Sequence, residues 1–221
     1  MEKKVVSFVI RNGRITKSQK KYLTHYQAQY SVGMDGWCNW ETVFGNHHPV
    51  VLDIGFGNGD DLFFQACKYP QYNFVGIEVY QAGIGRLLGK VVSEGLQHVR
   101  VVQKDAVEVV SQHIPTNTIA RVQLLFPDPW PKKKHHKRRI VQPAFVAELC
   151  RVLQVGGVLH IVTDHAGYAA HIDDVLGACE GLRPCGAGEG MIHFDRQPTR
   201  FEQRGLMRGH KIHPFSFIKK S

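Results

Sequence analysis

The amino-acid sequence predicts a doubly wound α/β fold, with a mostly parallel sheet and helices on both faces. Three observations lead to this prediction. Short apolar runs alternate with stretches of helical length, a glycine-rich turn follows the first main run, and an acidic residue stands at the end of successive runs. Short apolar runs bounded by turn residues are typical of buried strands in a parallel sheet. Because such strands alternate with helices, we expect one sheet with ligands at the carboxyl edge of its strands.

The first 45 residues are predicted to form a basic N-terminal arm and helix, and residues 46–221 a main domain. Thr16 is placed to cap a helix that runs to Tyr30, with Tyr22 and Tyr26 on the same face. Lysine and arginine recur through this segment. They fit an arm that touches phosphates, and they fit equally well a helix with a solvated basic side.

The first main strand, residues 50–54 (VVLDI), opens into a turn with three glycines: Gly55, Gly57 and Gly59. Glycine lets the backbone turn sharply and lets a ligand approach without a Cβ in the way. The dinucleotide fingerprint needs its third glycine at position 60, where this chain has Asp60. With Asp53 two residues before the turn, the pattern is instead that of an S-adenosylmethionine site, since the ammonium and cationic sulfur of that cofactor suit a carboxylate. A glycine-rich turn alone is about as often structural as ligand-binding.

The next two strands also end in acids. Residues 74–79 (FVGIEV) contain Glu78, which is placed to accept hydrogen bonds from two ribose hydroxyls. Residues 99–103 are followed by Asp105, which could accept from the adenine amino group. Each acid could instead cap the following helix, and for Asp105 alone the cap is the stronger interpretation. Three successive strands that each end in an acid favour a ligand site. The helix between the two strands, residues 80–94, is weakened by Gly83, Gly85 and Gly89.

The most distinctive stretch follows the fourth strand, residues 122–126, and continues as PDPWPKKKHHKRR to residue 139. Asp128 stands between two prolines, which fix φ and stiffen the loop. Trp130 offers a flat face beside this acid, and residues 132–139 are lysine, histidine and arginine. An acid on a stiff turn beside an aromatic face and a cationic run indicates chemistry on a base within a polyanion. The alternative is a buried strand end followed by a solvated charge run.

The remaining residues continue the alternation of strand and helix. We expect a helix over residues 140–153 that ends before Gly156 and Gly157, a strand over 158–162 that leads to Asp164, and a helix over 166–179. A short helix or loop begins at 198, and residues 213–219 form the last strand.

The composition points to nucleic acid or an anionic surface as a partner. Lysine and arginine number 28 against 19 acidic residues, which gives a net charge of +9 and a pI near 9.4. No apolar run approaches the roughly 20 residues that span a membrane, and the N-terminus lacks the apolar core of a signal peptide. The five cysteines form no Cys-x-x-Cys pair. We therefore expect reduced thiols, no metal site, no membrane partner and a cytoplasmic location.

These motifs together resemble the bacterial tRNA (guanine-N7-)-methyltransferases, of the Rossmann-like class I methyltransferases that use S-adenosylmethionine. The resemblance rests on the NGRITKSQ, DIGFGNG, GIEV, KDAVEV, LLFPDPWPKKKHHKRR, VTDHAGYA and TRFE segments. It implies an antiparallel last strand, tRNA as the partner, and methyl transfer to N7 of a guanosine in the variable loop. The chain is expected to act as a monomer or a homodimer.

Carried over by position, the resemblance also implies roles for single residues. Asp53, Glu78 and Asp105 resemble cofactor contacts, as do the three turn glycines, and Asp128 resembles a residue that is both cofactor-binding and catalytic. The implied substrate contacts are Lys132, Asp164, Thr199, Arg200, Phe201 and Glu202. The family more often has glutamate at the position of Asp53, and the shorter side chain could require a bridging water.

The chemistry is consistent with this resemblance. Guanine N7 carries a free lone pair, so no general base is needed, and Asp128 can stabilise a base that becomes cationic. Three other functions remain as alternatives. An amino-group methylase would use an Asp/Asn-Pro-Pro-aromatic turn, but this turn lacks the second proline. A dinucleotide-dependent oxidoreductase is disfavoured by Asp60, and a non-catalytic RNA-binding protein by the intact acids.

Overall fold

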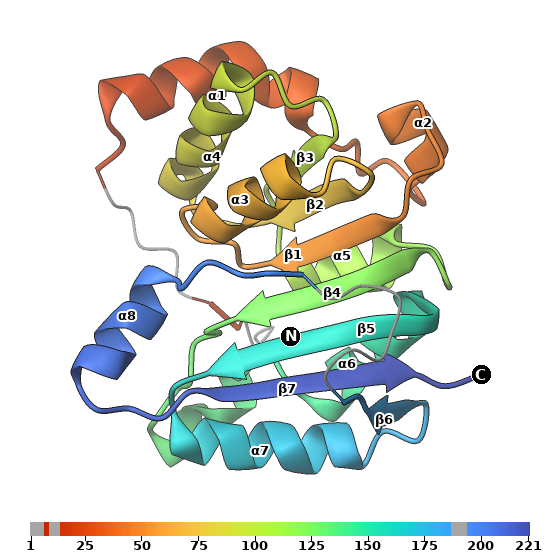
Figure 1. The fold of residues 1–221 in the computed structure, drawn as a ribbon, viewed down its shortest axis with the longest axis vertical. Coiled ribbons are helices and arrows are strands. Elements are labelled where there is room, and N and C mark those ends of the chain that lie inside the picture. Colours follow the sequence, from red (N-terminus) through yellow and green to blue (C-terminus); the bar gives the residue numbers. More distant parts are fainter. Residues whose placement is uncertain (1–6, 9–13, 187–193) are drawn as a thin grey trace, which may run out of the picture.

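The computed structural model describes residues 7–8, 14–186 and 194–221, and it contains a seven-stranded sheet of order β3-β2-β1-β4-β5-β7-β6 (Figure 1). The strands are β1 (Val50–Ile54), β2 (Asn73–Ile77), β3 (Val99–Val102), β4 (Ile119–Leu125), β5 (Leu153–Thr163), β6 (Leu182–Pro184) and β7 (His213–Lys219). Strands β1 to β5 are parallel to one another, and β7 runs antiparallel to both β5 and β6. The predicted fold class is confirmed.

Helices cover both faces of the sheet (Figure 1). They are α1 (Lys17–Tyr30), α2 (Trp40–Phe44), α3 (Asp60–Lys68), α4 (Gln81–Ser93), α5 (Ala106–His113), the 3-10 helix η1 (Lys133–Arg138), α6 (Pro143–Val152), α7 (Ala166–Gly177) and α8 (Arg200–Met207). One apolar cluster joins the sheet to α1, α3 and α4, and the other joins it to α5, α6 and α7. No described helix is long and apolar enough to cross a membrane.

Helix α1 begins at the predicted cap, because the Thr16 hydroxyl accepts from the Gln19 N–H and the Gln19 side chain accepts from the Thr16 N–H. The helix packs against α4 (Figure 1). A Cβ at Gly85 would stand 2.8 Å from the Gln19 carbonyl oxygen, which explains a glycine that the sequence marks only as a weakness of α4. The two helices approach closely because that position has no side chain.

The expected break at Gly156 and Gly157 lies inside strand β5, which is longer than residues 158–162. Gly156 has a φ of 78°, and the pairing between β4 and β5 is irregular at this point. The glycines therefore form an irregularity within the strand, since a left-handed glycine is tolerated in a bulge. The last strand has the predicted bounds.

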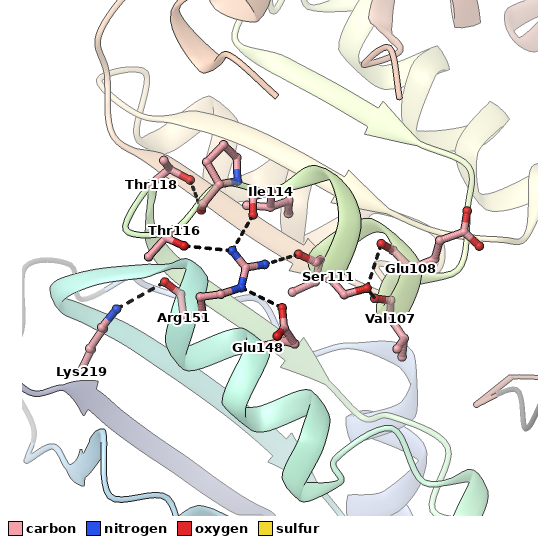
Figure 2. Close-up of polar contacts among 11 residues, drawn as sticks. Val107, Glu108, Ser111, Ile114, Thr116, Thr118, Glu148, Arg151 and Lys219 are labelled. Atoms are coloured by element: carbon pink, nitrogen blue, oxygen red, sulfur yellow. Dashed lines mark hydrogen bonds and ion pairs between the residues drawn. The ribbon is translucent and has the colours of Figure 1, made fainter. Parts of the chain in front are cut away.

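At the amino edge of the sheet, Arg151 ties α6 to the end of α5 (Figure 2). Its guanidinium donates to the Val110 carbonyl at 2.8 Å, to the Ile114 carbonyl at 3.0 Å, and to Glu148 at 2.8 Å. The carbonyls at the end of a helix have no partner within that helix, so Arg151 satisfies two of them. This anchor lies at the sheet edge opposite the acids at the strand ends.

Candidate functional site

The predicted acids meet at one edge of the sheet. Asp53 lies on β1, Glu78 follows β2, Asp105 follows β3, Asp128 follows β4 and Asp164 follows β5. Because these five strands are parallel and adjacent, their carboxyl ends lie side by side. The tertiary structure thus gathers the residues that the sequence distributes over more than a hundred positions.

Glu78 holds the glycine turn in place. Its carboxylate accepts from the Gly57 N–H at 2.8 Å, and from the N–H groups of Val79 at 2.8 Å and Tyr80 at 3.0 Å. Burial raises the pKa of Glu78, and these three hydrogen bonds oppose the rise. The turn needs glycine at position 57, because Gly57 has a φ of 59°. Helix α4 needs glycine at position 83, because a Cβ there would stand 2.0 Å from the Gly57 carbonyl oxygen.

Asp53 is a buried carboxyl group at the inner end of the turn. Only 2% of its surface is exposed, and its Oδ1 has no hydrogen-bond partner among the described residues. It lies beside the fully buried Gln123 in the sheet register, and the Gln123 side chain lowers the pKa of Asp53. Burial, and then the charge of Asp61, raise the pKa of Asp53 to about 8. In this structure the carboxyl group is therefore mostly neutral at pH 7.

The sequence did not single out Asp61, which lies on α3 and links this helix to the residues before α8. Its Oδ1 accepts from the Gln197 N–H at 2.7 Å, and burial raises its pKa to about 6. Next to Gln197, Arg196 forms a bidentate ion pair with Glu202, with 2.7 Å between Nη2 and Oε1. The residues that lead into α8 are thus tied to α3.

Asp105 caps helix α5, since its side chain accepts from the Val107 N–H at 3.0 Å. This is the contact that the sequence favours for Asp105 taken alone. The cap uses Oδ1, and the residue is only partly buried. A second role toward a ligand stays a prediction.

The loop after β4 carries Asp128 in an exposed position between two residues of unusual backbone geometry. Phe126 has a φ of 54° and Trp130 a φ of 43°. Such values are rare for aromatic residues and persist where neighbouring contacts hold them. The charge of Asp128 contributes to the raised pKa values of Glu78 and Tyr168, so this carboxylate stands near both. Asp128 therefore faces the same edge as Glu78.

The basic run is not uniform. Lys132, Lys133, Lys134 and Lys137 are exposed, and most of the run folds into η1. Arg138 stacks over Trp130 with 3.9 Å from its guanidinium carbon to the ring centre, and it donates to the Phe8 carbonyl at 3.1 Å. Arg139 is only 4% exposed. Nothing in the residue types distinguishes these two arginines, so the sequence did not predict the difference.

Helix α8 brings the predicted Thr199 to Glu202 segment to the same side. Thr199 caps the helix and Glu202 is buried in its ion pair, whereas Arg200 and Phe201 are exposed. Asp164 contacts the residues just after α8, since the His210 Nδ1 lies 3.0 Å from its Oδ2. Of the predicted substrate contacts, Asp164, Thr199 and Glu202 thus have structural contacts of their own. No group of three His, Cys, Asp or Glu that could hold a metal occurs among the described residues.

Comparison with known proteins gives close relatives over nearly the whole chain. A protein-family profile described as "Putative methyltransferase" matches residues 47–215. A tRNA (guanine-N(7)-)-methyltransferase of Xylella fastidiosa is 43% identical over 213 residues, which cover 95% of this chain and 87% of that protein. The protein of the same name from Alcanivorax borkumensis is 44% identical over 225 residues, covering 99% of this chain and 93% of that protein.

Solved structures share the fold at low sequence identity. The 16S rRNA methyltransferase KamB has a TM-score of 0.60 at 13% identity, covering 87% of this chain and 99% of that chain. An rRNA methylase from Streptococcus thermophilus has a TM-score of 0.51 at 14% identity, covering 81% and 91%. These structures support the fold, and the closer relatives support the family.

Proposed function

The chain belongs to the family of tRNA (guanine-N(7)-)-methyltransferases, and we propose that it transfers the methyl group of S-adenosylmethionine to N7 of a guanosine in the variable loop of tRNA. The observation that carries this proposal is the 43–44% identity to relatives of that name over 95% or more of the chain. We propose the cytoplasm as the location, where tRNA is modified. The arrangement of acids at the carboxyl edge of the sheet supports the same reaction.

The residues at this edge fit the cofactor. A buried carboxyl oxygen without a partner, Asp53 Oδ1, is costly unless a ligand pairs with it. Above it, a Cβ added at Gly55 or Gly57 would meet no other atom within 4 Å, so the turn leaves open space for a ligand. S-adenosylmethionine, when bound, supplies an electrophilic methyl group on a cationic sulfur, together with an ammonium group. In this proposal Asp53 accepts from that ammonium.

Glu78 and Asp105 hold the nucleoside part in this proposal. Glu78 already accepts three backbone N–H groups, and a carboxylate has about four acceptor positions. It has capacity left for a ribose hydroxyl, which it would meet in a geometry fixed by the glycine turn. Asp105 keeps one oxygen free of its cap and accepts from the adenine amino group.

Asp128 acts on the guanine. N7 attacks with its own lone pair, so this chain needs to position the base and to stabilise the positive charge that develops on it. The carboxylate of Asp128 lies in a loop between two prolines, and it transfers no proton in this reaction. Its charge favours the cationic product electrostatically, which is worth most when the group is preorganised.

The RNA lies along two exposed basic surfaces in this proposal. One is formed by Lys132, Lys133, Lys134 and Lys137 around η1, and the other by Arg200 and Arg204 on α8 with Arg208 at its C-cap. Arg200 and Arg204 are four residues apart, so they lie on one face of the helix. In this proposal Asp164 and the exposed Phe201 contact the target nucleotide.

The proposal is tested by incubating the protein with tRNA and labelled S-adenosylmethionine, digesting the RNA and identifying the methylated nucleoside. 7-Methylguanosine is the expected product. A label on an exocyclic amino group would favour the amino-group methylase, and RNA binding without any label would favour a non-catalytic RNA-binding protein. A tRNA with 7-deazaguanine at the target position keeps the Watson–Crick edge but has carbon at the reacting atom, so it should bind and remain unlabelled.

A further inference from the structure

Arg139 differs from the rest of the basic run because its side chain is buried. Only 4% of its surface is exposed, while the lysines of the run are exposed to solvent. A buried guanidinium is stable only when its donors are paired, and five N–H groups must be accommodated. Its contacts therefore indicate what this arginine does in the folded protein.

Those contacts join three separate segments of the chain. The Arg139 Nε donates to the Pro129 carbonyl at 2.9 Å, and Nη1 donates to the Gly167 carbonyl at 3.4 Å. Nη2 lies 3.1 Å from Nε2 of His136, in η1. The guanidinium also lies over the ring of Tyr168, 4.9 Å from its centre. Arg139 thus links the loop of Asp128, η1 and the start of α7.

The α7 side of this arrangement is rigid. Tyr168 is fully buried, and its hydroxyl accepts from the Val141 N–H at 3.3 Å. One turn later, His171 contacts the Val141 carbonyl, with 2.7 Å between Nε2 and the oxygen. Both the N–H and the carbonyl of Val141, two residues after Arg139, are therefore hydrogen-bonded to side chains of α7. From this position Arg139 reaches the Pro129 carbonyl.

The loop that Arg139 contacts needs such support. Pro129 directly follows Asp128, and it lies between Phe126 and Trp130, both of which have positive φ. Backbone conformations of this kind are unfavourable for aromatic residues and persist only where surrounding contacts determine them. The hydrogen bond from a charged donor to the Pro129 carbonyl is such a contact.

We propose that Arg139 is a positioning residue for methyl transfer: it holds the Pro129 carbonyl and thereby fixes the Asp128 carboxylate, and it does not bind RNA phosphate. This inference rests on the proposed function. Neighbouring residues of the same basic run thus have different roles: the exposed lysines contact the RNA, and Arg139 contacts the protein backbone. Displacement of a reacting group by about 1 Å can lower a rate by about 10²-fold, which sets the expected effect.

The test compares Arg139→Gln and Arg139→Lys with Arg151→Gln as the matched control. Arg151 also donates to backbone carbonyls, but it lies at the opposite edge of the sheet, so its substitution should lower stability without changing the reaction. For Arg139→Gln we expect a fall in kcat of about 10²-fold, with little change in the KM for tRNA or in cofactor affinity. Arg139→Lys keeps the positive charge but replaces the planar fork of five N–H donors by a compact ammonium group, so its kcat should lie between those of wild type and Arg139→Gln.

A spectroscopic measurement reports on the loop itself. In a Trp37→Phe, Trp40→Phe background Trp130 is the remaining tryptophan of the chain, so its emission and its quenching by acrylamide follow the loop directly. Both should change in the two Arg139 variants and stay constant in Arg151→Gln. The Arg139→Lys variant keeps the test available if Arg139→Gln does not fold.

Two results would overturn the inference. If kcat falls no more in the Arg139 variants than in Arg151→Gln at the same loss of thermal stability, Arg139 is only structural. If KM for tRNA rises and its salt dependence weakens while kcat is unchanged, Arg139 is an RNA contact. Wild-type protein without any methyl transfer would instead refute the proposed function, so the two failures are distinguishable.

Discussion

The neutral state of Asp53 predicts a strong dependence of stability on pH. The pKa of Asp53 in the folded protein is raised to about 8 from an ordinary value of 3.8, so between these values the folded state keeps a proton that the unfolded state has lost. Stability is therefore highest below about pH 4 with respect to this group and falls as pH rises to about 8. The shift corresponds to at most about 5–6 kcal/mol across that window, at 1.36 kcal/mol per pH unit.

The perturbation is Asp53→Asn, which keeps the shape and removes the titration. In urea unfolding, the free energy of unfolding of wild type should fall by several kcal/mol more than that of Asp53→Asn between pH 5 and pH 8. Parallel pH profiles for the two proteins would show that Asp53 is ionised at neutral pH in the folded state and would refute this reasoning.

The same carboxyl group links cofactor binding to proton release. An ammonium group beside Asp53 favours its charged form, so binding of S-adenosylmethionine at pH 7 should release up to about one proton. Calorimetric titrations in buffers of different ionisation enthalpy measure that number. In Asp53→Asn the release should vanish and the affinity should fall. A binding enthalpy that is independent of the buffer in wild type would exclude Asp53 as the partner of the ammonium.

Three further predictions concern the reaction, the RNA surface and the fold. Asp128→Asn should fold and bind tRNA but turn over roughly 10²–10³-fold more slowly, and near-normal single-turnover rates would remove Asp128 from its role. Joint substitution of Lys133, Lys134 and Lys137 by Gln should weaken tRNA binding and reduce the slope of log affinity against log salt by roughly 0.7–0.9 per lost phosphate contact. An unchanged slope would indicate a merely solvated surface. Arg151→Ala should lower the unfolding free energy by about 2 kcal/mol, because two carbonyls at the end of α5 lose a charged donor; an unchanged urea midpoint would contradict this.

Features that depend on neighbours in the chain could be predicted from the sequence. The cap at Thr16 is formed by residues three positions apart, and the bounds of β7 follow from one apolar run. The meeting of the acids at one edge was also predictable, because parallel strands joined by helices must bring their carboxyl ends together. The division into an arm and a main domain, and the functional roles of single residues, stay predictions.

Features that depend on contacts between distant segments came only from the tertiary structure. Gly85 has its reason in the backbone of α1, some sixty positions earlier, and Asp53 is neutral because of its burial beside Asp61. The residues Arg138 and Arg139 are identical in type and adjacent in sequence, yet one stacks on an indole and the other is buried against α7. The sequence by itself determined which chemical groups the chain carries and the order of its strands and helices along the chain. The folded chain decided which of those groups are paired, buried or free to meet a ligand, because burial and pairing are set by which distant segments pack together.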